Sequence, residues 1–71
     1  MEKLVIGGVY RHFKGTLYRV VGTAKHSETL EEMVIYHPVD DDGALWVRPL
    51  SMFFEDVERD GKTMKRFAFA E

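Results

Sequence analysis

The chain contains no cysteine, which excludes disulfide bonds and thiolate zinc sites. It also has no long hydrophobic run: its apolar stretches span only a few residues, whereas a membrane-spanning helix needs about 20. A charged segment followed by an apolar stretch, the pattern of a secretory signal, is missing from the amino terminus. These absences predict a cytoplasmic protein with no membrane partner.

The length predicts a single small domain, residues 1–71. Hydrophobic residues make up 45% of the chain and aromatic residues 13%, a composition too apolar for a disordered protein. A core of this size rarely supplies more than about 3 to 5 kcal/mol of net stability, so small domains often gain stability by association. We expect a folded domain that lacks a deep cavity and can form a homo-oligomer.

The hydrophobic pattern predicts short strands rather than helices. Apolar and polar residues alternate with a period of two, and turn residues recur at short intervals. We expect strands at residues 9–13, 17–24, 30–39, 45–48 and 63–70, and a helical turn within residues 51–57. The predicted fold is all-β or mainly β: a small five-stranded SH3-like barrel, or a curled antiparallel sheet, with one short helical turn before the last strand.

Charge is unevenly distributed along the chain, although the net charge is only −2. Residues 1–27 hold five Lys or Arg and one Glu, residues 28–60 hold ten acidic residues and two Arg, and residues 61–71 have a net charge of +2. If the first and last strands pair, the basic residues of both ends gather on one side of the domain. The plainer interpretation is a solvated face.

Three short segments combine polar, charged and aromatic residues more densely than folding alone requires. They are residues 8–15, 26–29 and 46–53. Such a combination suggests a binding surface, because Trp, Tyr and Arg are the residues most enriched at interface hot spots. The candidate ligand-binding residues are Tyr10, Arg11, His12, His26, Glu28, Trp46 and Arg48. Four of them are expected on one contiguous surface: His26, Glu28, Trp46 and Arg48.

Several of these residues also have structural roles open to them. Aromatic residues such as Tyr10 usually fill a core. Arg11 and His12 are neighbours in a predicted strand, so one of the two faces outward whichever face is buried. Arg48 has nearby acids with which it could form an internal ion pair, namely Glu28 or Glu55.

The order of the motifs resembles a known family. The motifs are Gly8-x-Tyr-Arg-His-Phe-Lys-Gly15, Tyr18-x-Val20, Ala24-x-His-Ser-Glu-Thr29, Val34-x-Tyr36, Trp46-Val-Arg-Pro-Leu-x-Met-Phe53, and Gly61 followed by Arg66-Phe67. Together, over residues 8–67, they are similar to a family of small bacterial domains of unknown function. The resemblance implies a short bacterial protein and no established activity. Residues 37–43 are more acidic than the aliphatic or aromatic stretch typical of that family.

A protein or peptide partner is the favoured interpretation. A Trp beside an Arg and a Pro, with Tyr nearby, is typical of the aromatic grooves that bind extended or proline-rich segments. Single-stranded nucleic acid is the alternative, with Trp46 stacking on bases and Arg11, Arg48 and Arg66 contacting phosphates. The sequence pI near 5.9 argues against it. A small polar ligand whose carboxylate or phosphate is held by Arg11 and Arg48 is also open.

Catalysis is a more remote interpretation. A hydrolase could use His26, Ser27 and Glu28, but neighbouring side chains in a strand point to opposite faces, and a triad needs convergent geometry. Ser27 and Thr29 more simply satisfy local backbone donors. A metal site could combine the three histidines with Glu28, but their spacing matches no compact motif. We therefore predict no cofactor, no metal and no catalytic residue.

Overall fold

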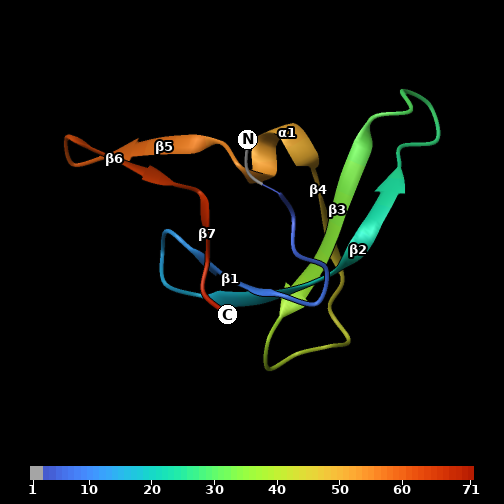
Figure 1. The fold of residues 1–71 in the computed structure, drawn as a ribbon, viewed down its shortest axis with the longest axis horizontal. Coiled ribbons are helices and arrows are strands. Elements are labelled where there is room, and N and C mark those ends of the chain that lie inside the picture. Colours follow the sequence, from blue (N-terminus) through green and yellow to red (C-terminus); the bar gives the residue numbers. More distant parts are fainter. Residues whose placement is uncertain (1–2) are drawn as a thin grey trace.

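Five strands form one antiparallel sheet in the computed structural model, which describes residues 3–71 (Figure 1). The strands are β1 (Val9–His12), β2 (Leu17–Lys25), β3 (Glu32–Pro38), β4 (Trp46–Pro49) and β7 (Phe67–Phe69). Their order across the sheet is β4-β3-β2-β1-β7, so the first and last strands pair. β-Branched and aromatic residues at alternate positions favour extended structure in these segments.

A separate hairpin and one helical turn complete the described fold. The hairpin consists of β5 (Asp56–Arg59) and β6 (Lys62–Lys65), and the helical turn is α1 (Leu50–Phe53). Asp60 and Gly61 form the hairpin turn with φ angles of 54° and 75°, which Asp-Gly pairs adopt readily. No helix within residues 3–71 is long and apolar enough to cross a membrane. The prediction of a mainly β fold with one short helical turn is confirmed, although three strands and not one follow that turn.

The carboxyl-terminal part differs from the sequence prediction. The pattern predicts one strand over residues 63–70, whereas the structure has two strands that belong to different sheets, and β5 occupies part of the predicted helical turn. Arg66 separates β6 from β7: its N–H donates to the Glu55 carbonyl at 2.9 Å, and its own carbonyl accepts from the Phe13 N–H at 3.0 Å. These two bonds bend the chain at a point where the alternation of residues gives no signal.

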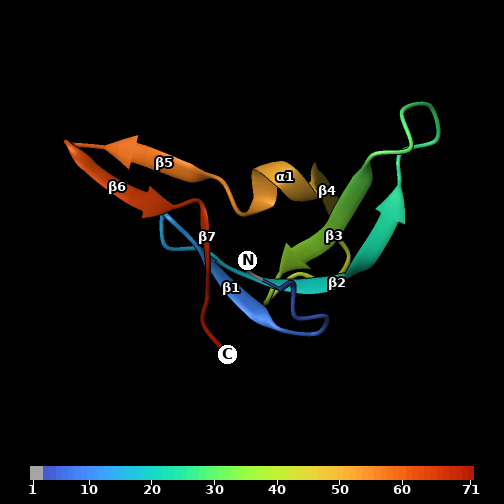
Figure 2. The same cartoon turned by 45° about the horizontal axis from the view of Figure 1, so that its top comes forward.

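The sheet curls but does not close into a barrel. β4 and β7 are its two edges, and among residues 3–71 no strand joins one edge to the other. Figures 1 and 2 show the sheet curving beneath α1 and the β5–β6 hairpin, which lie over its concave side. The register of β2 shifts between Val20 and Gly22, and such bulges increase the bend of a strand. Of the two predicted architectures, the curled antiparallel sheet is the one observed.

Aromatic side chains fill the concave side of the sheet. Phe53 of α1 stacks on Phe67 of β7, with ring centroids 4.3 Å apart and an interplanar angle of 4°. Tyr10 and Tyr36 meet Phe53 edge-on at 5.2 and 5.8 Å. Such pairs contribute about 0.5–1.5 kcal/mol beyond the area they bury, so Phe53 holds α1 against the sheet. The buried core consists of Tyr10, Val20, Val34, Tyr36, Phe53 and Phe67.

Candidate functional site

His12 and Arg48 lie on the concave side of the sheet, at the margin of the aromatic core. The register pairs His12 with Phe67 of β7, and Arg48 with Val34 of β3. The His12 ring lies 5.0 Å from the Phe67 ring, and the guanidinium carbon of Arg48 lies 5.9 Å from the centre of that ring. One buried aromatic ring therefore brings together two predicted residues from strands that are not neighbours.

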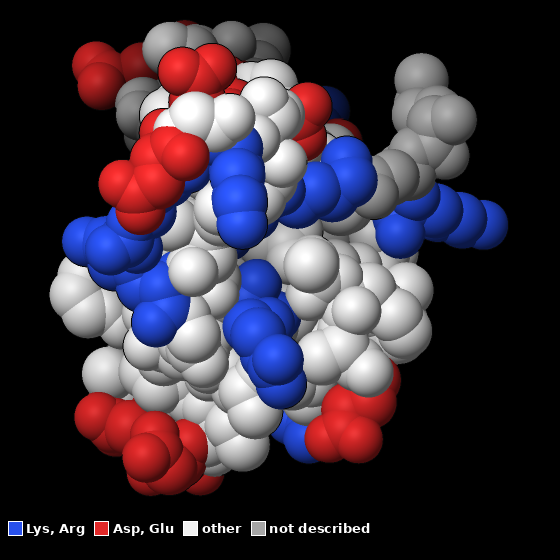
Figure 3. Space-filling view, turned by 90° about the vertical axis from the view of Figure 1, so that its left-hand side faces the viewer, with Lys and Arg blue, Asp and Glu red and all other residues white. Residues whose placement is uncertain are grey.

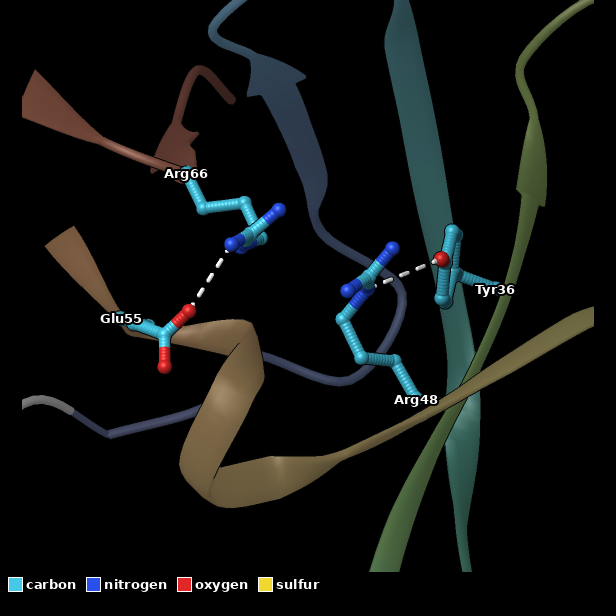
Figure 4. Close-up of polar contacts among 4 residues, drawn as sticks. All are labelled: Tyr36, Arg48, Glu55 and Arg66. Atoms are coloured by element: carbon cyan, nitrogen blue, oxygen red, sulfur yellow. Dashed lines mark hydrogen bonds and ion pairs between the residues drawn. The ribbon is translucent and has the colours of Figure 1, made fainter. Parts of the chain in front are cut away.

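Arg48 has an aromatic environment and no carboxylate partner within residues 3–71. Its Nε–H donates to the Tyr36 hydroxyl over 3.5 Å (Figure 4). The alternative role of Arg48, an ion pair with Glu28 or Glu55, is not observed: no ion pair within residues 3–71 includes Arg48, and Glu55 pairs with Arg66. The two terminal nitrogens of Arg48 make no hydrogen bond within the described chain. They remain available to an acceptor from outside.

Arg66 directs a second guanidinium group into the same space between α1 and the sheet (Figure 4). The bend between β6 and β7 positions it, and its Nη2 donates to Glu55 Oε1 at 2.8 Å. Its side chain is 22% exposed, and its Nε–H is the one buried side-chain donor in residues 3–71 without a hydrogen-bond partner. An unpaired buried donor costs about 1–3 kcal/mol. The Glu55 ion pair therefore satisfies one side of the Arg66 guanidinium and leaves its Nε–H without a protein partner.

The His12 imidazole sits in a positive field. Burial lowers its pKa below the ordinary value of 6.5, and the positive charges of Arg48, Arg66 and Lys14 lower that pKa further, because neighbouring cations disfavour the imidazolium. Its Nδ1 accepts a hydrogen bond from the Lys14 N–H at 3.2 Å, so the neutral ring carries its proton on Nε2. We refer to Lys14, Arg48 and Arg66 around His12 as the cationic cluster.

Basic side chains extend beyond this cluster over one face of the molecule. Figure 3 shows Lys and Arg across the middle of that face, with most acidic side chains toward its upper and lower margins. Lys14 in the β1–β2 turn and Arg59 of β5 each lie 5.9 Å from the centre of the Phe13 ring. Residues from both ends of the chain, Lys14 and Arg66, therefore meet on one side, as the charge pattern predicts if the terminal strands pair.

Tyr10 and Arg11 lie away from the cationic cluster. Tyr10 is 2% exposed and belongs to the core, and its hydroxyl accepts from the Val5 N–H at 3.1 Å. Arg11 is the next residue of β1, so its exposed side chain points to the convex face. Arg11 therefore cannot hold one ligand group together with Arg48, as the sequence interpretation of a small polar ligand assumes.

His26 and Glu28 lie in the loop that joins β2 to β3. The Nδ1 atom of His26 accepts from the backbone N–H groups of Glu28 at 3.1 Å and Thr29 at 3.4 Å, and Thr29 Oγ1 accepts from the Glu31 N–H at 3.2 Å. These bonds shape the loop, and none of them joins the His26 ring to the Glu28 carboxylate. Among residues 3–71, no group of three or more His, Asp or Glu side chains is placed to hold a metal ion.

Trp46 lies on the edge strand β4, at a distance from the His26 loop. Trp46 pairs with Tyr36 of β3. The His26 N–H donates to the Glu31 carbonyl, so Glu31 marks the loop end of β3, five residues before Tyr36. At about 3.3 Å per residue, five residues of strand span about 16 Å. Trp46 therefore lies away from the loop along the strand, whereas Arg48, which pairs with Val34, lies nearer to it. Trp46 and Arg48 do share the concave side, and Trp46 is 56% exposed.

Two basic residues of the cluster were not among the candidate ligand-binding residues. Lys14 belongs to the dense segment 8–15 and follows His12 by two residues, a spacing that could have indicated it. Arg66 entered the sequence analysis as a contact to phosphate and as part of the family motifs. Its position depends on the bend that Glu55 and Phe13 hold, and nothing local in the sequence marks that bend.

Comparison with known proteins identifies the family. The model of a family described as a protein of unknown function, DUF1653, matches residues 8–69. The chain belongs to the DUF1653 family. A crystal structure of a DUF1653 protein from Bordetella bronchiseptica is 33% identical with a TM-score of 0.79, over 90% of this chain and 85% of that one. No curated protein matches the chain. The resemblance noted in the sequence is confirmed, and the description of DUF1653 names no activity.

Proposed function

We propose that this DUF1653 protein is a binding module that recognises an acidic segment of a protein partner. The cationic cluster carries the proposal: His12 and the Arg48 guanidinium both lie against the Phe67 ring, Arg66 enters the same space, and Arg48 has no carboxylate partner in the described chain. A guanidinium group binds a carboxylate through two parallel N–H···O bonds. The terminal nitrogens of Arg48 suit this contact, and Arg66 and Lys14 add positive charge beside it.

The aromatic surroundings of Arg48 favour such an interaction. Its guanidinium lies over the Phe67 ring and beside the Tyr36 hydroxyl, so protein replaces water on that side of the charge. Charge-assisted hydrogen bonds are stronger where water is excluded. A guanidinium that is already oriented also loses less conformational freedom when a ligand binds.

An acidic protein segment fits this face better than a nucleic acid does. Acidic side chains lie at the margins of the basic face (Figure 3), and the whole chain has a net charge of −2. A nucleic acid carries a phosphate at every nucleotide and would bring several of them against those acids. A peptide presents its carboxylate at one point. The exposed Trp46 near Arg48 adds a residue type that often anchors protein interfaces.

Titration with a short acidic peptide tests the proposal. Trp46 is the single tryptophan of the chain, so its fluorescence reports binding near Arg48. We expect a blocked peptide of Gly and Glu to change the Trp46 emission saturably, and Arg48→Gln to weaken the affinity by about tenfold or more, because a hydrogen bond to a charged group contributes about 1.5–3 kcal/mol. The matched control, Arg11→Gln, removes an exposed arginine from the convex face and should leave the affinity unchanged.

The His12 ring gives a second readout. A carboxylate bound in the cationic cluster favours the imidazolium, so the pKa of His12 should rise when the peptide is added, as followed by NMR of the ring protons. Equal peptide affinity in the wild type and Arg48→Gln would contradict the proposal. Tighter, Arg48-dependent binding of oligothymidylate than of the peptide would replace it with single-stranded nucleic-acid binding.

A further inference from the structure

The outer edge of β4 is open and apolar. β4 ends the strand order, and no strand of the described chain pairs with its outer side. Leu45, Trp46 and Val47 are consecutive, and their side chains are 61%, 56% and 61% exposed. Proteins usually protect an open edge with charge, proline or a covering element, because its unpaired backbone groups recruit another strand. Here only Arg48 and Pro49 give such protection.

We propose that the acidic segment binds by adding an antiparallel strand to this edge. The inference rests on the proposed function, because the carboxylate that Arg48 receives belongs to the added strand. Backbone hydrogen bonds to β4 then give affinity, and side chains at alternate positions give specificity. All pairings within the sheet are antiparallel, and antiparallel pairing is slightly more stable per residue than parallel pairing.

The register of β4 determines which sequence the added strand needs. Trp46 and Arg48 face the concave side and Val47 faces the convex side. A strand that runs antiparallel to β4 meets Arg48 first, then Val47, then Trp46. The complementary order from the amino end is therefore an acidic residue, an apolar residue, and an apolar or aromatic residue. Each such cross-strand pair contributes about 0.2–1 kcal/mol.

A second copy of this chain fits the edge less well. It would place its own Arg48 on the same face of the same short ribbon, where the two positive charges repel each other. An acidic strand brings the opposite charge to Arg48, which has no carboxylate partner in residues 3–71. Arg48 therefore favours a partner of the stated chemistry over self-association.

The test compares blocked pentapeptides of one composition. Thr-Glu-Val-Phe-Thr has the complementary order, and Thr-Phe-Val-Glu-Thr has the reverse order. We expect the first to bind at least about fivefold more tightly, a factor that corresponds to about 1 kcal/mol of lost cross-strand pairing. In amide NMR spectra the first peptide should shift Trp46, Val47 and Arg48 and slow hydrogen exchange at one or more of these residues.

N-Methylation of the peptide separates strand addition from simple charge attraction. One peptide has N-methyl groups at both Glu and Phe, and the other has one at Val alone, so the two lose alternate backbone donors. Only one of these two sets of N–H groups points toward β4. The peptide that loses that set should bind about tenfold more weakly, because it loses hydrogen bonds to β4. If both peptide orders and all methylated forms bind equally through Arg48, strand addition is overturned and the proposed function stands. If no acidic peptide binds, both are overturned. A dimer that forms through β4 without peptide, seen by sedimentation, would assign the edge to a second copy instead.

Discussion

Among single residues, His12 reports most directly on the cationic cluster. Its ring packs on Phe67 at 5.0 Å, and its Nδ1 already accepts a backbone hydrogen bond. Burial, followed by three neighbouring cations, opposes its protonation. The folded protein therefore resists the proton that the unfolded chain accepts freely, and this difference makes stability depend on pH.

The first prediction concerns that pH dependence. The pKa of His12 is lowered in the folded state from its ordinary value of 6.5. As the pH falls below 6.5, the unfolded chain therefore binds a proton at His12 before the folded protein does. The free energy of unfolding should fall over this interval and level off below the folded pKa. His12→Gln should reduce this fall. Urea denaturation at several pH values from 7.5 to about 4.5 measures it, and an identical pH dependence in both proteins would contradict the assignment.

A second prediction separates binding from stability at Arg48. Its guanidinium has no carboxylate partner in the described chain, so its removal breaks no ion pair. Arg48→Met preserves most of the side-chain volume and should change the free energy of unfolding by less than about 1 kcal/mol, while peptide binding is lost. Denaturant titration and the Trp46 fluorescence assay give the two values. A large loss of stability would indicate a structural role instead.

At the scale of elements, the β5–β6 hairpin stands apart from the main sheet. Within residues 3–71 its two strands pair only with each other, from Asp56 opposite Lys65 to Arg59 opposite Lys62. Lys65 also lies 3.8 Å from Asp56 as an exposed ion pair, which contributes little. Its turn therefore matters for its stability, and the hairpin carries the bend that positions Arg66.

The third prediction uses two glycines. Gly61 has a φ of 75°, a conformation that alanine adopts at a cost of about 1–2 kcal/mol. Gly61→Ala should accelerate amide hydrogen exchange within residues 56–65 while the five-stranded sheet keeps its protection. Gly43→Ala is the matched control, because Gly43 is not among the glycines with positive φ and the nearest atom to an added Cβ is 3.6 Å away. Equal exchange in both variants would show that the turn is not limiting.

At the scale of the whole molecule, one aromatic cluster holds an open sheet together. Figure 2 shows α1 over the concave side of the sheet, and Phe53 is its buried residue. The stack of Phe53 on Phe67 joins the helical turn to the edge strand β7. Because the sheet has no strand pairing between its two edges in residues 3–71, these side chains supply the closure that backbone bonds would give a barrel.

The fourth prediction follows from that closure. Phe53→Ala removes a fully buried ring and should cost about 3–5 kcal/mol, which is comparable to the net stability of about 3–5 kcal/mol expected for a domain of this size. The variant should be largely unfolded at 25 °C by circular dichroism. Met52→Ala, a neighbour in α1 with a 38% exposed side chain, should remain folded. Cooperative folding of Phe53→Ala at wild-type stability would contradict this account of the core.

The sequence by itself determined the first four strands, the opposite faces of neighbouring residues such as Arg11 and His12, and the presence of His12 and Arg48 among the candidate site residues. These properties follow from a period of two and from turn residues, which act over a few neighbours. Only the tertiary structure decided that Arg11 points away, that Trp46 lies away from the His26 loop, and that Arg66 enters the space between α1 and the sheet. The reason is that the order of strands and the bend at Arg66 depend on contacts between residues far apart in the chain, such as Arg66 with Phe13 and Arg48 with Phe67.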